Sequence, residues 1–188
     1  MVGVHNSFRK RRVLVIILVV SGTITSSYFL AGFESTRNIA FELADSAYRL
    51  RGPQNSTITL VLEAVVSFPN AVLDPTLRNM GFSLMVDSYP MGTLTAPSAH
   101  AGFHPASLLR TSPRCVVYRL AFQSDNRMIS ESLAKTPTNL LFLSASGTAS
   151  AGLYQGGIST SASGSTLPEG TRISIDWLCN EVQVPAGK

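Results

Sequence analysis

Residues 8–33 read FRKRRVLVIILVVSGTITSSYFLAGF, and this stretch decides the architecture of the chain. Four basic residues, 9–12, stand directly before the 21 uncharged residues 13–33. A helix rises about 1.5 Å per residue, so this run would span roughly 32 Å, enough to cross a hydrocarbon core of about 30 Å. Because basic residues are retained on the cytoplasmic side, the pattern predicts a cytoplasmic tail (1–12), a transmembrane helix (13–33) and an extracytoplasmic remainder. The expected location is the cell membrane, with a single pass.

Two other leaders share part of this pattern. A cleaved signal peptide has a shorter apolar region and an Ala-x-Ala exit site, which residues 28–33 lack. A pilin-like leader is cut just before the apolar run and usually carries a Glu near its start, and neither feature occurs here. The sequence therefore favours a retained signal-anchor over both alternatives.

The second half of the predicted span is rich in small and hydroxyl residues. Their hydroxyls can bond back to carbonyls of their own helix, and their small size lets helices approach closely in a membrane. The interpretation is either an anchor that tolerates them or a helix that docks against other membrane helices, with Gly22 and Ser26 as the packing positions.

The net charge of the chain has to be counted separately for the cytoplasmic tail and for the external part. The chain has 15 Lys and Arg against 11 Asp and Glu, but four of the basic residues belong to the tail. The external part therefore has 11 of each sign, so the basic patch that nucleic-acid binding requires is missing.

Two cysteines, Cys115 and Cys179, both follow the span. A compartment beyond the cytoplasm permits a disulfide, and the sequence leaves open whether they pair or remain two buried thiols. Asn55 opens an Asn-Ser-Thr sequon, which is a glycosylation site only if the host glycosylates.

The external part is predicted to be a short helical stalk (34–52) followed by one β-domain (53–188). In the stalk, Ile39, Leu43, Ala47 and Leu50 recur at helical spacing, and Gly52-Pro53 ends the pattern. Beyond it, β-branched and alternating runs predict strands at 57–68, 81–87, 91–94, 114–122, 139–149 and 172–179, with a short helix at 128–135. This pattern is typical of an immunoglobulin- or fibronectin-like β-sandwich.

Residues 144–170 are dense in Ser, Gly, Ala and Thr. A flexible linker is one interpretation. Strong strands flank the segment, however, so we expect it to form strands whose small side chains permit close approach by another sheet or another subunit. Gly156 and Gly157 are the predicted contact positions.

Two stretches carry a family resemblance. LVLEAVVSFPN (60–70) and MGFSLMVDSYPMG (80–92) resemble the opening of a late embryogenesis abundant group-two domain, also called the water-stress and hypersensitive-response domain. That family has Asn-Pro-Asn where this chain has Phe68-Pro69-Asn70, so the first Asn is missing. The resemblance implies a sandwich, often tethered by one membrane helix, with no catalytic residues and with roles in stress protection, binding or lipid contact.

Motifs for chemistry are weak. His100 and His104 are four residues apart, but Pro97, Gly102 and Pro105 indicate a loop, so we expect no metal. No Gly-x-Ser-x-Gly elbow or phosphate loop occurs, and we predict no catalytic residue, no cofactor and no small-molecule substrate.

Three functional hypotheses remain. The first is a non-catalytic accessory or scaffold subunit of a larger membrane or envelope assembly, with other membrane-protein subunits and the lipid bilayer as its partners. The second is a free-standing stress-protection or lipid- or protein-binding module, and the third, least supported, is an enzyme.

Overall fold

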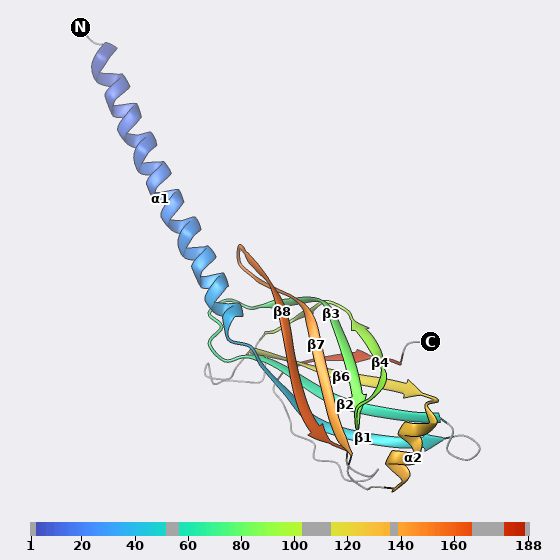
Figure 1. Cartoon of the computed structure of the whole chain (residues 1–188). Helices are drawn as coiled ribbons and strands as arrows, with labels where there is room; N and C mark the ends of the chain where they lie inside the picture. The colour runs from blue at the N-terminus through green and yellow to red at the C-terminus, as the bar shows by residue number, and fades with distance from the viewer. Residues whose placement is uncertain (1–2, 52–56, 103–113, 136–138, 167–178, 187–188) are drawn as a thin grey trace.

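One long helix stands on a two-sheet β-domain (Figure 1). The computed structural model describes residues 3–51, 57–102, 114–135, 139–166 and 179–186. Sheet A has the strand order β1 (Ala40–Arg51), β2 (Thr57–Phe68), β6 (Arg114–Ser124), β9 (Asn180–Val184). Sheet B has the order β4 (Tyr89–Ala96), β3 (Thr76–Val86), β7 (Leu140–Ala151), β8 (Tyr154–Ser165), with β5 (Ala99–His100) paired to β3. The mainly β prediction with a preceding helix is confirmed.

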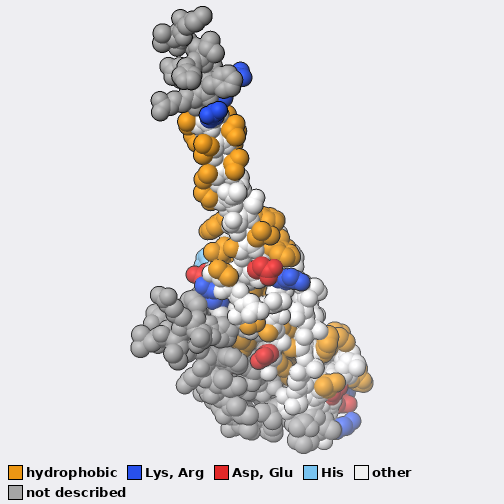
Figure 2. Space-filling view, turned by 90° about the vertical axis from the view of Figure 1, so that its left-hand side faces the viewer, with side chains coloured by type: hydrophobic (Ala, Val, Ile, Leu, Met, Phe, Trp, Pro, Cys, Tyr) orange, Lys and Arg blue, Asp and Glu red, His pale blue; other side chains and the backbone are white. Residues whose placement is uncertain are grey.

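Helix α1 (Gly3–Arg37) contains the apolar run. Its segment Arg11–Arg37 is long and apolar enough to cross a membrane, and no residue of its most apolar 18-residue window is buried. Figure 2 shows hydrophobic side chains along the helix between basic groups near its far end and charged groups at its base. The expected back-bonding is confirmed, since the hydroxyls of Ser21, Thr23 and Thr25 donate to carbonyls of the preceding turn at 2.8–3.1 Å.

The core lies between the two sheets. Along β2 and β3, alternate side chains are buried, as the period of a strand requires. The rings of Phe82 on β3 and Tyr118 on β6 meet across the core, with centroids 5.0 Å apart. The largest fully buried side chains also include Phe68, Phe122, Leu60, Leu62, Leu77, Met80, Leu84 and Leu120.

The predicted helical stalk over residues 34–52 is wrong. Helix α1 ends at Arg37, and β1 pairs antiparallel with β2 over its full length. Ile39, Phe41 and Leu43 alternate along the chain and pack against the core, which is a strand pattern. A bulge between Leu43 and Asp45 then breaks this alternation, and the interrupted pattern imitates helical spacing. The domain boundary expected at residue 53 therefore moves to about residue 39.

Most of the other predicted elements overlap the observed ones where the structure is described, but β3 begins at Thr76, five residues before the predicted strand 81–87, and β9 was not predicted. The 57–68 strand has the expected limits, the hairpin forms with positive φ at Asp87 and Ser88, and α2 (Arg127–Lys135) is the expected short helix. Asn126 caps that helix by accepting a hydrogen bond from the Met128 amide at 3.0 Å. The small-residue segment forms β7 and β8 instead of a linker. The strand predicted at 172–179 falls almost entirely outside the described residues.

Candidate functional site

The end of α1 is packed into the domain. The ring of Tyr154, which opens β8, meets Phe29 and Phe33 edge to face, with centroid distances of 5.6 and 5.2 Å. Gly32 lies directly against the carbonyl oxygen of Ala151, and a Cβ at this position would overlap that oxygen. The helix is thus joined to the turn between β7 and β8 by ring contacts and by a close backbone approach.

The same turn requires glycine at residue 152. Gly152 has φ +56°, and a Cβ there would lie 2.9 Å from both Tyr28 of the helix and Leu73 of the loop before β3. Any other residue would combine a strained backbone with a steric overlap.

The end of α1 also makes a second contact, with the loop before β3. The Ser35 hydroxyl accepts hydrogen bonds from the amides of Val72 and Leu73 at 3.0 and 2.9 Å, and donates to the Ala31 carbonyl at 2.7 Å. Arg114 pairs with Asp74 and donates to the Val72 carbonyl at 3.1 Å. We call these contacts, together with those of Tyr154 and Gly32, the joint. It fixes the direction in which the domain stands on the helix.

The two outer faces of the domain differ in charge. The strands of sheet A carry Glu42, Asp45, Arg49, Arg51, Glu63, Arg114, Arg119 and Glu181. Arg119 bridges Glu63 and Glu181 at 2.8 and 3.4 Å across three neighbouring strands of this sheet. By contrast, β4, β7 and β8 contain no Asp, Glu, Lys, Arg or His, and β3 contains Arg78 alone.

The outward residues of sheet B form what we call the hydroxyl face. The strand register places Thr93, Ser83, Ser144 and Ser161 in one cross-strand row. The next row is Thr95, Gly81, Ser146 and Ser159. Because Gly81 has no side chain, the centre of the face is hollowed into a shallow depression of ≈ 270 Å³. The register also places Arg78 on this face, in one row with Thr148 and Gly157, and its side chain is exposed. The two hydroxyl rows themselves contain no residue that could act as an acid or base near neutral pH.

Apolar side chains lie at the end of the hydroxyl face nearest the β3–β4 hairpin. Met85 and Phe142 are cross-strand neighbours and are 37% and 44% exposed. Leu140, at the start of β7, is also exposed. A surface with few charges avoids the large cost of burying ions, and each hydroxyl that another protein covers needs a hydrogen-bond partner on that protein.

The predicted contact positions Gly156 and Gly157 are separated by the pleat. Gly157 faces outward on the hydroxyl face, with no atom within 4 Å of a Cβ placed there. Gly156 faces the other way, and its Cβ would lie 2.7 Å from the Tyr154 hydroxyl. Adjacent strand residues point to opposite faces, so only Gly157 belongs to the hydroxyl face and Gly156 borders the joint.

On the helix, Gly22 and Ser26 are both exposed, and a Cβ at Gly22 would meet nothing within 4 Å. They lie four residues apart and therefore on one side of α1. This side is open to another helix.

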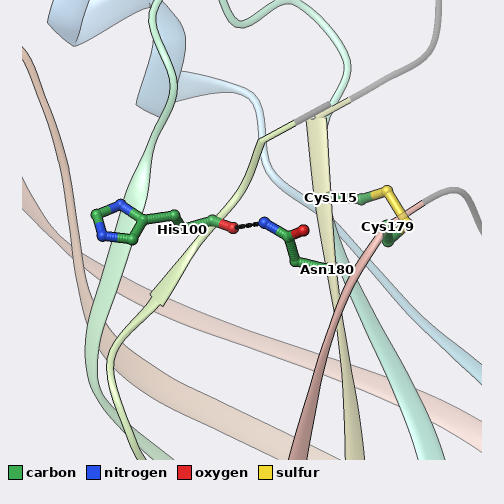
Figure 3. The surroundings of a disulfide bond; sticks show 4 residues. All are labelled: His100, Cys115, Cys179 and Asn180. Carbon is green, nitrogen blue, oxygen red and sulfur yellow. Dashed lines mark hydrogen bonds between the residues drawn. A yellow bond between two sulfur atoms is a disulfide. The ribbon is translucent and has the colours of Figure 1, made fainter. Parts of the chain in front are cut away.

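The two cysteines are paired. Cys115 and Cys179 form a disulfide with their Cα atoms 5.0 Å apart, and it packs with Val65 and Val117 outside sheet A. Figure 3 shows the bond beside the start of β9, where the Asn180 side chain donates to the His100 carbonyl at 2.6 Å. The disulfide and this hydrogen bond hold the short parallel strand β9 in place.

The histidine pair is not assembled into a site. The His100 ring points away from the disulfide and lies 2.9 Å from the Thr76 hydroxyl, while His104 lies outside the described residues. Within the parts of the chain that the structure describes, no group of three or more His, Cys, Asp or Glu is arranged for a metal ion. Asn55, the predicted glycosylation residue, also lies outside the described residues.

The core contains one buried polar group that the sequence did not predict. The Tyr118 hydroxyl is the single buried side-chain polar atom of the described residues without a hydrogen-bond partner. Burial raises the pKa of this phenol. The alternation of β6 marks residue 118 as inward, but nothing local in the sequence indicates that its hydroxyl has no partner.

The fold defines a class, a two-sheet β-domain carried on one N-terminal apolar helix. No protein-family model matches the chain, and no curated protein matches it significantly. Among solved structures, one crystal structure of a protein from Archaeoglobus fulgidus is 12% identical, with a TM-score of 0.37, covering 65% of this chain and 94% of that one. A Northeast Structural Genomics Consortium target is 10% identical, with a TM-score of 0.37, covering 74% and 93%.

Proposed function

We propose that this chain is a single-pass membrane protein that serves as a non-catalytic accessory or scaffold subunit of a larger membrane or envelope assembly. Its N-terminus would be cytoplasmic and its β-domain extracytoplasmic, as the basic residues 9–12 indicate. The observation that carries the proposal is the hydroxyl face, a surface of small hydroxyl side chains. Arg78 is the one Asp, Glu, Lys, Arg or His residue on β3, β4, β7 and β8, whereas the strands of sheet A carry many charged residues.

The occupant of the hydroxyl face is another protein subunit in the same membrane. The joint fixes the direction of the domain relative to α1. The hydroxyl face therefore keeps a constant orientation to the membrane and a constant distance from it. Small side chains allow the partner's backbone to approach closely, and the depression at Gly81 accepts one protruding side chain. In the membrane, the side of α1 that carries Gly22 and Ser26 packs against a partner helix.

The test is the size of the native assembly after gentle detergent extraction. Ser159→Arg places a long charged side chain on the edge strand β8, beside the depression of the hydroxyl face, and Gln123→Arg makes the same charge change on an exposed position of β6 in sheet A. We expect Ser159→Arg to release the chain from its assembly, while Gln123→Arg leaves the assembly intact. Both positions are exposed, so the melting temperature of the chain should not change in either variant.

Leucine at Gly22 or Ser26 tests the membrane contact separately, because both positions are exposed and a Cβ at Gly22 would meet no atom within 4 Å. A wild-type chain that runs as a monomer after gentle extraction, with no effect of any of these substitutions, contradicts the assembly. It would favour the alternative, a free-standing module for stress protection or for lipid or protein binding.

One observation favours the lipid-binding part of this alternative. Leu153 and Val72 are exposed beside the helix end, where a bilayer covers them without any protein partner.

A further inference from the structure

Two exposed apolar residues flank the base of α1. Leu153, at the tip of the β7–β8 turn, is 59% exposed, and Val72, in the loop before β3, is 66% exposed. Figure 1 shows the β7–β8 turn rising beside the last turns of the helix instead of pointing away from it. Figure 2 shows hydrophobic side chains gathered where the helix meets the domain.

The joint gives the height of each residue along the helix. Leu153 stands between Gly152, which packs on Tyr28, and Tyr154, which packs on Phe29. The level of Tyr28 is five residues inside the end of the uncharged run at Phe33, which corresponds to about 7.5 Å along the axis.

Val72 is held at a lower level. Its amide bonds to Ser35, which lies just past the uncharged run and next to the charged residue Glu34. Arg114 and Asp74, which fix this loop, form an ion pair at the same level. Leu153 therefore lies level with the apolar part of the helix, and Val72 lies level with its first charges.

We propose that the β-domain is seated on the membrane, with the β7–β8 turn inserted into the bilayer beside α1. Leu153 reaches the acyl chains, and Val72 lies in the headgroup layer, which is roughly 5–8 Å thick on each side. This inference rests on the proposed membrane anchor, because it takes the position of the bilayer from the uncharged run of α1.

The lipid surface explains why an apolar tip is left uncovered. The helix that carries the tip is itself the part of the chain that enters the bilayer, so the surface that would cover Leu153 is continuous with the one that covers Tyr28 and Phe29. The turn also lacks charge, since no charged residue occurs between Leu140 and Ser165. Insertion of a leucine is favourable, whereas a charged turn at this depth would not enter.

The test uses the full chain in phosphatidylcholine vesicles, with an environment-sensitive fluorophore on one introduced cysteine. The native cysteines are disulfide-bonded and do not react. Leu153→Cys reports on the tip, and Ser163→Cys, an exposed position near the other end of β8, is the matched control. Ile17→Cys, an exposed position within the uncharged run of α1, marks the bilayer. Quenching is measured with lipids that carry a nitroxide near the top of the acyl chain.

The probes at residues 153 and 17 are expected to be quenched several-fold more strongly than the probe at residue 163. The quenching of a probe at Val72→Cys should be weaker than at residue 153 and stronger than at residue 163. Quenching at residue 17 with none at residue 153 overturns the seating and leaves the anchor intact. No quenching at either position overturns both the seating and the anchor. The substitution at residue 153 is on an exposed tip, and non-reducing electrophoresis would show whether the native disulfide is retained.

Discussion

Removing the disulfide should cost the domain a large part of its stability. Cys115 and Cys179 are separated by 64 residues, and the loop-entropy model assigns about 4 kcal/mol to a closed loop of this length. For a domain of this size, a loss of about 4 kcal/mol corresponds to a fall of roughly 8–16 °C in melting temperature. The effect acts mainly through the unfolded chain, which gains freedom when the loop opens.

The structure also determines how the assay has to be run. The two cysteines are 3% and 4% exposed, so reductant reaches them slowly while the domain is folded. The full chain should therefore be unfolded and reduced, refolded in detergent with reductant, and melted by circular dichroism beside the oxidised protein. The control is the double variant Cys115→Ala, Cys179→Ala, whose melting temperature should be low and should not respond to reductant.

A local effect should accompany the global one. Cys179 directly precedes β9, and on its other side β9 is held by the hydrogen bond from Asn180 to the His100 carbonyl. Amide exchange should therefore increase first in β9 after reduction. Equal melting temperatures for the oxidised and fully reduced chains would refute the loop-entropy reasoning.

Two further substitutions test the packing of the domain. Tyr118→Phe should raise the free energy of unfolding by about 1 kcal/mol in denaturant titrations, because it removes a buried hydroxyl that has no partner within the described residues. Burial raises the pKa of this phenol above its ordinary value of 10.0, so the native state loses stability as the pH rises above 10.0, and the variant should lose less; equal alkaline unfolding curves would contradict this. Gly147→Ala should destabilise by roughly 1–3 kcal/mol, because its Cβ would lie 2.5 Å from the Met80 sulfur and 3.0 Å from the Arg78 carbonyl. Gly157→Ala, with no atom within 4 Å, is the matched control, and equal losses in the two variants would show that the close approach at Gly147 is unimportant.

Local sequence patterns predicted the elements whose signals are uninterrupted. The strand β2 has a continuous β-branched run that ends at Pro69, and α2 has apolar residues at helical spacing. The strand β1 was missed because a bulge at Leu43 changes its period and leaves apolar residues at helical spacing. Its true partner is β2, and this pairing supplies the hydrogen bonds that a stalk helix would have made internally.

The joint could not be predicted from the sequence. Tyr154 and Phe29 are far apart in the chain, and no local pattern indicates that a hairpin turn will pack on a membrane helix. The sequence did indicate that the small-residue segment forms strands instead of a linker, and its close packing against another subunit stays a prediction. Two adjacent residues of one strand necessarily point to opposite faces, but the sequence could not show which of Gly156 and Gly157 faces outward, because that depends on the register of β8 against β7.

The most direct test of the central claim is site-specific photo-crosslinking in intact membranes. A photoreactive phenylalanine analogue would replace Ser161 on the hydroxyl face or, in a second variant, Gln123 on sheet A; both positions are exposed. If the hydroxyl face binds another subunit, the probe at residue 161 yields one discrete cross-linked protein band and the probe at residue 123 does not. The absence of a band at residue 161, or the same band from both positions, would contradict the account.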